Sequence, residues 1–306
     1  MSQPTLTLLV QLIKEQQFDG VLCVGAPRLF EQLRSDLDSL RTMLLDIDSR
    51  YEAFLSPNEF ARFSMFAGSF YSESAEERVA LFIRNSAKLL IFADPPFGGM
   101  VSPLARSMQI LARLHHQQTA HFILVYPSFL RHQINAAFPE LSMLDYEVTY
   151  ENQRKFKKAG SRVRLFTTLP PCSVTLPDHQ YKLCSKCKKF VRKCCKHCKV
   201  CQRCVVTTGS QAQQHCEACA RCVKTTYSHC ASCDKCHLPE AKCVTGLVKC
   251  HLCGETGHKR VDCPQKQNCS GERRTDAKRP ISTVAATEAK RKKKKIGGRK
   301  SDSTLA

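Results

Sequence analysis

The sequence has no tryptophan and no long apolar run. Nothing in it approaches the roughly eighteen consecutive apolar residues that a membrane-spanning helix needs. Its first residues, MSQPTLTLLVQLIKEQQ, lack the basic segment followed by an apolar one that marks a secretory signal. We therefore expect a soluble, intracellular protein with no membrane partner, whereas the missing tryptophan excludes no fold class.

Cysteine is scarce in the first half of the chain, and acidic residues are scarce in the second. Only one of the 20 cysteines precedes residue 172. Residues 1–150 carry 12 Lys and Arg against 16 Asp and Glu, and residues 151–306 carry 35 against 11. The strongly cationic second half favours a polyanionic partner, with nucleic acid as the leading candidate. In a reducing compartment its clustered cysteines are metal ligands more often than disulfides.

From residue 18 onward, apolar segments that predict buried strands alternate with segments of helical periodicity. The predicted strands are residues 21–24, 43–47, 89–93, 122–126, 144–150 and 162–167, and the predicted helices include residues 27–40 and 104–116. This order is typical of an α/β fold, a mostly parallel Rossmann-like sheet with helices on both faces. A ligand of such a sheet binds at the carboxyl ends of the strands.

Three predicted strands end in residues suited to ligand binding. Gly25 lets the backbone turn close to a ligand before a helix begins at Pro27. Asp46 ends the next strand, where a carboxylate can accept both ribose hydroxyls of a nucleoside cofactor, although a solvated strand end is the simpler interpretation of this residue alone. The strongest signal is the third, Asp94-Pro95-Pro96-Phe97.

The Asp-Pro-Pro-Phe segment suits transfer to an exocyclic amino group of a nucleobase. Such an amine is a poor nucleophile, because its lone pair is delocalised into the ring. The Asp94 carboxylate and the Pro95 carbonyl can accept its two hydrogens, and the prolines hold these acceptors still. Phe97 can stack on a base flipped out of its helix. The alternative is a strand end whose Asp caps a helix that the prolines initiate.

This segment resembles the (D/N/S)PP(Y/F/W) motif of amino-directed, S-adenosylmethionine-dependent class I methyltransferases. Together with CVGAPRLFEQL, LLDIDSRY, SMFAGSFY, MLDYEVTY and the cysteines behind them, DPPFGGMVSPLA resembles the zinc-knuckle (CCHC) N6-adenosine methyltransferases of large-subunit ribosomal RNA, from about residue 18 to residue 264. The resemblance implies S-adenosylmethionine as cofactor and structured RNA, specifically large-subunit rRNA, as partner. It implies catalytic residues Asp94, Pro95, Pro96 and Phe97. It also implies cofactor-binding residues Pro27, Arg28, Leu29, Phe30, Asp46, Ser64, Met65 and Asp94.

The chain departs from the family pattern at several points. Phe30 stands where the family has His, and Ala67 stands where it has Asn. The family's upstream zinc fingers are missing, and we expect their loss to weaken RNA engagement and to uncover apolar surface. A catalytically silent RNA-binding adaptor is therefore the alternative to an enzyme. DNA adenine, cytosine N4 or a glutamine side chain are alternative acceptors.

One cysteine-rich unit, His-Cys-x2-Cys-x2-Cys, occurs three times between residues 197 and 236. Zinc takes four Cys or His ligands, and a Cys-x2-Cys turn presents two thiolates to one ion. The candidate ligands are Cys184, Cys187, His197, Cys198, Cys201, Cys204, His215, Cys216, Cys219, Cys222, His229, Cys230, Cys233, Cys236, His237 and Cys243. These sixteen are enough for four structural zinc ions, although spacing does not determine which ligands share an ion.

With few apolar residues between positions 184 and 243, metal binding must supply the folding free energy of this region. Disulfides or free thiols are the alternative. The family position for the last His appears as Ala241 here, so His237 is its substitute. The unit also resembles the cysteine-rich domain of protein S-palmitoyltransferases. Because the Asp-His-His-Cys tetrad and membrane spans are missing, we do not expect acyl transfer.

A zinc knuckle with a fifth ion follows, with ligands Cys250, Cys253, His258 and Cys263. Knuckles bind single-stranded or looped nucleic acid through exposed bases, although a structural or protein-binding role is possible here. The basic residues 154–162 predict either an RNA contact or a solvated hairpin loop. The basic run at residues 290–300 predicts a nuclear and nucleolar address, with the cytoplasm as a further location.

The predicted domains are a methyltransferase domain at 1–176, incomplete at its N-terminus, a multi-zinc domain at 181–245, a knuckle at 248–265 and a disordered basic tail at 266–306.

Overall fold

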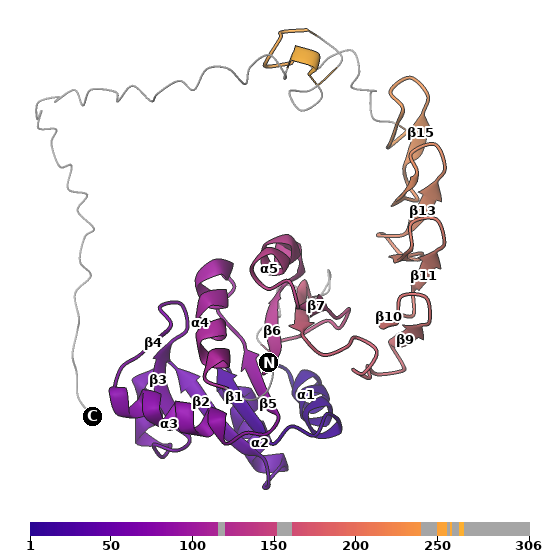
Figure 1. Cartoon of the computed structure of the whole chain (residues 1–306). Helices are drawn as coiled ribbons and strands as arrows, with labels where there is room; N and C mark the ends of the chain where they lie inside the picture. The colour runs from indigo at the N-terminus through magenta and orange to yellow at the C-terminus, as the bar shows by residue number, and fades with distance from the viewer. Residues whose placement is uncertain (116–119, 152–160, 240–249, 256–257, 259–262, 266–306) are drawn as a thin grey trace, which may run out of the picture. The chain divides into compact units, whose positions relative to one another are not determined.

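The computed structural model describes residues 1–115, 120–151, 161–239, 250–255, 258 and 263–265 (Figure 1). The chain divides into two compact units, Met1–Lys242 and Cys243–Ala306. The first unit contains an eight-stranded sheet, its helices and a series of small hairpins. Among the described helices, none has both the length and the apolarity that crossing a membrane requires.

The sheet has the strand order β4-β3-β2-β1-β5-β6-β8-β7. Its strands are β1 Gly20–Val24, β2 Arg41–Asp46, β3 Phe60–Ser64, β4 Ser69–Phe70, β5 Leu89–Ala93, β6 His121–Pro127, β7 Ser142–Met143 and β8 Val163–Thr167. The strands β3, β2, β1, β5 and β6 are parallel, and β4 and β8 run antiparallel to their neighbours. The mostly parallel α/β sheet is therefore confirmed, with a reversal of strand order between β1 and β5 that opens a ligand crevice in doubly wound folds.

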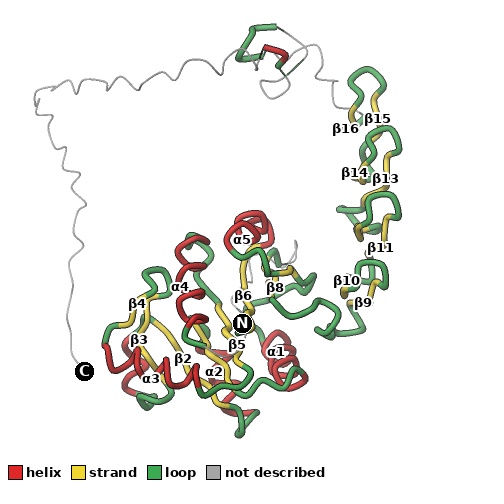
Figure 2. The backbone as a smooth tube through the Cα atoms, in the orientation of Figure 1, coloured by secondary structure: helices red, strands yellow, loops and turns green. Residues whose placement is uncertain are grey.

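Helices cover both faces of this sheet (Figure 2). They are α1 Gln3–Glu15, α2 Pro27–Asp36, α3 Glu73–Arg84, α4 Val101–Arg113 and α5 Arg131–Ala137, with short turns η1 Ser49–Ala53 and η2 Ser128–Leu130. Successive strand residues point to opposite faces, so Cys23 packs in the core beneath α1 and α2, whereas Val24 packs in the core beneath α3 and α4. Two separate apolar cores hold the sheet.

Three helices and three strands of the sheet were not among the predicted elements, namely α1, α3, α5, β3, β4 and β7. The strand predicted at residues 144–150 was wrong. Residues 144–150 are not a regular strand, because β7 ends at Met143. The backbone N–H groups of Leu144 and Val148 donate hydrogen bonds to β8, but Glu147 and Thr149 of this segment bond to residues outside the sheet. Thr149 exchanges hydrogen bonds with the start of α1, and the N–H of Glu147 donates to the hydroxyl of Tyr181. These partners replace a regular ladder.

Four antiparallel hairpins follow the sheet (Figure 1). They are β9–β10 (Tyr181–Cys184 and Lys189–Arg192), β11–β12 (Cys195–Cys198 and Arg203–Val206), β13–β14 (Gln213–Cys216 and Arg221–Lys224) and β15–β16 (Ser228–Cys230 and Lys235–His237). Each turn contains a Cys-x2-Cys pair followed by a residue with φ near +50°, namely Lys188, Gln202, Ala220 and Asp234. We refer to them in chain order as the first to fourth hairpins.

The first hairpin is attached to the sheet domain by buried and polar contacts. Tyr181 belongs to the core beneath α1 and α2. Arg192 forms an ion pair with Glu147 at 3.3 Å, and the same carboxylate pairs with Arg164 on β8 at 3.2 Å. Because these groups are partly buried and shared, they fix the hairpin more firmly than an isolated surface pair would.

Candidate active site and metal centres

The parallel register gathers the predicted site residues at one edge of the sheet. Val24, the last residue of β1, lies beside Leu45 of β2 and Ala93 of β5. Since parallel strands end at the same edge, Asp46, Gly25 and Asp94 lie side by side in that order, and the crevice between β1 and β5 separates Gly25 from Asp94. Ser64 ends β3 at this same edge.

Gly25 lets two loops approach β1 closely. Its φ is +63°, a left-handed conformation that glycine adopts without strain. A Cβ here would lie 2.3 Å from Cε of Met65 and 3.3 Å from the carbonyl oxygen of Asp94. A side chain here would be strained by the positive φ and would displace the end of Met65, so Gly25, Met65 and Asp94 form a tight cradle at the strand ends.

Asp94 is the electrostatic centre of this edge. Tyr150 donates its hydroxyl hydrogen to Oδ1 of Asp94 at 2.7 Å. Burial raises the pKa of Asp94 to about 6, and the hydrogen bond from Tyr150 opposes that rise. The same burial, reinforced by the Asp94 charge, raises the pKa of Tyr150 well above its usual range, so Tyr150 stays a neutral donor. Among the described residues, no side chain donates a hydrogen bond to the second carboxylate oxygen, which can therefore accept a hydrogen from a substrate.

The residues after Asp94 form the mouth of the site. Pro95 is buried, whereas Pro96 and Phe97 are exposed, with 40% of Phe97 accessible. The Phe97 ring meets Tyr150 edge to face, with centroids 5.7 Å apart. Tyr150 therefore contacts both the carboxylate and the Phe97 ring, and the exposed part of Phe97 can stack on a base.

Tyr150 was not among the residues predicted for the site. The segment MLDYEVTY does carry a signal for it, because alternate residues Leu144, Tyr146 and Val148 are buried and Tyr150 continues that alternation. The period of two places Tyr150 on the inward face, but nothing local to the segment indicates that Asp94 is its partner.

The four predicted cofactor residues at the start of α2 differ in whether their side chains can reach the crevice. Pro27 begins α2, and Arg28 pairs with Glu151 at 3.2 Å. Leu29 and Phe30 are at most 1% exposed and pack in the core, so neither side chain faces the crevice and only their backbone can serve a ligand.

The acidic and hydroxyl residues of the crevice are engaged in local turns. Asp46 accepts the N–H of Asp48 at 3.0 Å, and the Ser64 hydroxyl accepts the N–H of Ala67 at 3.3 Å. Each keeps further acceptor capacity. The glycine cradle and the strand-end carboxylate at Asp46 fit a nucleoside cofactor such as S-adenosylmethionine, with Asp46 for the ribose hydroxyls.

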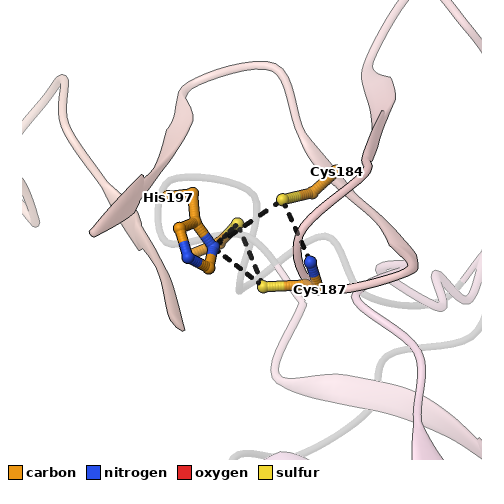
Figure 3. A group of neighbouring side chains, drawn as sticks. Cys184, Cys187 and His197 are labelled. Atoms are coloured by element: carbon orange, nitrogen blue, oxygen red, sulfur yellow. Dashed lines mark hydrogen bonds between the residues drawn. The ribbon is translucent and has the colours of Figure 1, made fainter. Parts of the chain in front are cut away.

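The hairpins bring the predicted zinc ligands into four-residue clusters with mutual ligand distances within 4.8 Å. The clusters are Cys184, Cys187, His197 and Cys204; Cys198, Cys201, His215 and Cys222; Cys216, Cys219, His229 and Cys236; and Cys250, Cys253, His258 and Cys263. In the first, the sulfur of Cys187 lies 3.6 Å from that of Cys204 and 3.2 Å from Nδ1 of His197 (Figure 3). These separations match the edges of a tetrahedron with the usual zinc bond lengths.

The ligand partition follows from the hairpin register. His197 lies directly across the second hairpin from Cys204, and His215 lies across the third from Cys222. Each such cross-strand pair meets the Cys-x2-Cys turn of the preceding hairpin. Every complete site in the hairpin series therefore joins two neighbouring hairpins, and no sequence unit forms a site alone.

The last hairpin brings Cys230, Cys233 and His237 together. Cys243, another predicted ligand, lies outside the described residues, as do residues 154–160 of the predicted basic loop and the predicted tail at 266–306. The knuckle cluster has the Cys3His donor set of a structural zinc site. All five groups are compatible with zinc, and none of the four complete sets leaves a coordination position for catalysis.

The doubly wound sheet, with its Asp-Pro-Pro-Phe strand end beside a glycine cradle, defines a class I methyltransferase domain. Residues 1–169 match the family model described as "Probable N6-adenine methyltransferase", and residues 248–265 match that of the zinc knuckle. The chain therefore belongs to the N6-adenine methyltransferase family and carries a CCHC zinc knuckle.

Similar proteins include three described as rRNA N(6)-adenosine-methyltransferase ZCCHC4. The one from Homo sapiens is 32% identical over 94% of this chain and 63% of its own length. The one from Mus musculus is 36% identical over 84% of this chain and 54% of its own length. The one from Xenopus tropicalis is 35% identical over 94% of this chain and 65% of its own length. The chain thus spans less than two thirds of the length of these relatives.

Among solved structures, a predicted O-methyltransferase from Agrobacterium tumefaciens matches with a TM-score of 0.34 and 12% identity, covering 53% of this chain and 78% of its own. An S-adenosyl-L-methionine methyltransferase from Silicibacter pomeroyi matches with a TM-score of 0.32 and 14% identity, covering 55% and 99%. Both values are too low to support an assignment.

Proposed function

We propose that this chain transfers a methyl group from S-adenosylmethionine to N6 of adenosine in structured RNA, with large-subunit ribosomal RNA as the substrate. Membership of the N6-adenine methyltransferase family supports the reaction, and the three ZCCHC4 relatives and the knuckle support the RNA class. The observation that carries the proposal is Asp94, a partly buried carboxylate held by Tyr150 beside an exposed aromatic ring.

The catalytic role of this edge is positioning. Phe97 stacks on the flipped adenine, and the Asp94 carboxylate and Pro95 carbonyl accept the two N6 hydrogens, which directs the nitrogen lone pair toward the methyl group. The bound S-adenosylmethionine supplies an activated methyl group with a neutral leaving group, so no general acid is needed. Since the pKa of Asp94 is raised to about 6, this carboxylate accepts the proton released from N6 more readily than an ordinary aspartate does.

The zinc centres act on structure and RNA placement rather than on the reaction. Their complete ligand sets close the coordination sphere, and their hairpins are stabilised mainly by the metal, because few of their apolar residues are buried. A chain stripped of zinc is expected to keep its methyltransferase sheet while losing RNA engagement through the hairpins and knuckle.

Labelled methyl transfer into total RNA, followed by nucleoside separation, tests this function. The zinc-loaded chain should produce N6-methyladenosine, and Asp94→Ala should abolish the product while S-adenosylmethionine binding persists. RNA binding without transfer by the unsubstituted chain would refute the enzyme and favour the adaptor. Label in cytosine, DNA or protein would refute the acceptor.

We also propose a nuclear and nucleolar location, on the basis of the basic tail at residues 290–300. A fluorescent fusion that stays outside the nucleus, with or without the tail, would contradict it.

A further inference from the structure

A groove of about 790 Å³ lies between α5 and the first two hairpins. Its wall on the sheet domain includes Arg131, His132 and Asn135 of α5, and its opposite wall includes Lys189 of the first hairpin and Arg203 of the second. We propose that this junction groove binds the phosphate backbone of the RNA substrate, an inference that rests on the proposed function for the identity of the polyanion.

The charge of the groove fits a polyanion. Arg131, Lys189 and Arg203 bring three cations from three different elements. The acidic residue among the lining groups is Asp145, and its carboxylate already lies within 4.0 Å of Arg164 and Arg192. With zinc bound, the first metal site has a net charge of −1, because the ion offsets two of its three thiolates. This charge offsets one of the three cations and leaves the groove positive. Lys and Arg so arranged attract phosphates by counterion release.

The position of the groove suits a strand that reaches Asp94. β6 runs parallel to β5, with Leu124 beside Ala93, so its last residues reach the level of Asp94. The turn η2 then leads directly into Arg131, the first residue of α5. This turn carries Phe129, whose side chain is 66% exposed. An exposed aromatic ring between a catalytic edge and a cationic groove is a platform on which an unpaired base stacks.

The groove depends on the first zinc centre. Cys187 and Cys204, two ligands of that centre, line its floor, and Lys189 and Arg203 are their near neighbours in sequence. Because this site joins the first and second hairpins, zinc fixes the separation between Lys189 and Arg203. This geometry gives the first centre a role in RNA placement that the later hairpins do not share, because none of their residues lines this groove.

The test compares the double variant Lys189→Gln/Arg203→Gln with Lys14→Gln/Arg84→Gln in the full zinc-loaded chain. The second pair removes the same charge from exposed cations at the ends of α1 and α3, next to the amino ends of β1 and β5 and so at the edge opposite Asp94. The probe is a fluorescein-labelled hairpin RNA with unpaired adenosine in its loop, and its affinity is measured by anisotropy from 50 to 300 mM salt without S-adenosylmethionine. Zinc content by mass spectrometry confirms intact metal sites.

The groove variant should bind RNA roughly tenfold more weakly at physiological salt, with the slope of log K against log salt reduced by about 1.5, because two phosphate contacts are lost. The control pair should stay within twofold of the unsubstituted chain. Phe129→Ala should weaken binding with little change in salt slope, since stacking releases no counterions. Equal losses in both charge variants, or no loss in the groove variant, would overturn the proposal.

Because binding is measured without methyl transfer, the outcome separates the two proposals. If the unsubstituted chain methylates RNA and the groove variant binds RNA normally, only the proposal that the groove binds RNA is refuted. A chain whose groove variant loses RNA but that transfers no methyl group would refute the proposed reaction alone. If both hold, the groove variant should raise KM for RNA and leave kcat unchanged.

Discussion

The charge on Asp94 is predicted to cost stability, and Asp94→Asn tests this directly. The amide is nearly isosteric with the carboxylate, and its oxygen can still accept the hydroxyl of Tyr150 that lies 2.7 Å from Oδ1. The substitution therefore removes the charge and keeps the packing. Since burial is the main cause of the raised pKa, removing the charge should stabilise the fold where the carboxylate is ionised.

The size of the stability change, and the pH range over which it occurs, follow from the raised pKa of Asp94. The pKa of Asp94 rises from 3.8 to about 6, and two units correspond to about 3 kcal/mol at most. A raised carboxyl pKa means that the folded state binds the proton more tightly. Stability is therefore fully present below pH 3.8 and is lost as pH rises through about 6. The advantage of Asp94→Asn should accordingly be about 1 kcal/mol larger at pH 8 than at pH 5.

Urea unfolding at the two pH values measures this difference. Tyrosine fluorescence and far-ultraviolet circular dichroism serve as probes, because the chain has no tryptophan. Asp38→Asn, at an exposed carboxylate, is the matched control and should change stability by less than about 0.5 kcal/mol. Zinc loss at low pH affects all three chains alike. An Asp94→Asn chain less stable at pH 8 than the unsubstituted chain, or with no change between pH 5 and pH 8, would refute the reasoning.

Three further outcomes are expected. Tyr150→Phe removes the donor that lowers the pKa of Asp94, so the acid limb of kcat/KM should move to higher pH, and an unmoved limb would contradict the coupling. Gly25→Ala should weaken S-adenosylmethionine binding at least tenfold by calorimetry and cost about 1–2 kcal/mol of stability, because a residue with a Cβ is strained at φ +63°. Gly98→Ala, whose Cβ would have nothing within 4 Å, should change neither. One four-residue zinc site that joins two hairpins consists of Cys198, Cys201, His215 and Cys222. Joint replacement of these residues should remove one zinc ion by native mass spectrometry, whereas the loss of two ions would indicate that each sequence unit forms its own site.

The sheet was predictable where burial leaves a simple periodic signal. β1 and β5 are buried at every position, as expected for central parallel strands, and their apolar runs were recognised. Apolar spacing alone did not reveal α3, although Ser72 caps this helix and acidic residues occupy its first turn. The strand predicted at residues 144–150 was wrong, because alternating burial does not determine whether the backbone forms a regular ladder of hydrogen bonds.

The candidate site was predictable only in part, for a reason of sequence distance. Asp94 and its neighbours follow one strand, and their chemistry can be argued from residue types. Tyr150 meets Asp94 across 56 positions, and only the tertiary structure brings them together. The zinc ligands were recognised from spacing, but their partition depends on which residues face each other across a hairpin. The side chains of Leu29 and Phe30 belong to the core, which a resemblance alone could not reveal.

The most direct test of the central claim supplies S-adenosylmethionine with a deuterated methyl group to the zinc-loaded chain and separated large-subunit and small-subunit rRNA, with Asp94→Ala in parallel. Mass spectrometry of the nucleosides then reports where the label resides. We expect deuterated N6-methyladenosine in large-subunit rRNA, and we expect it to disappear in the variant. Label in another nucleoside, label confined to small-subunit rRNA, or equal N6-methyladenosine from Asp94→Ala would contradict it.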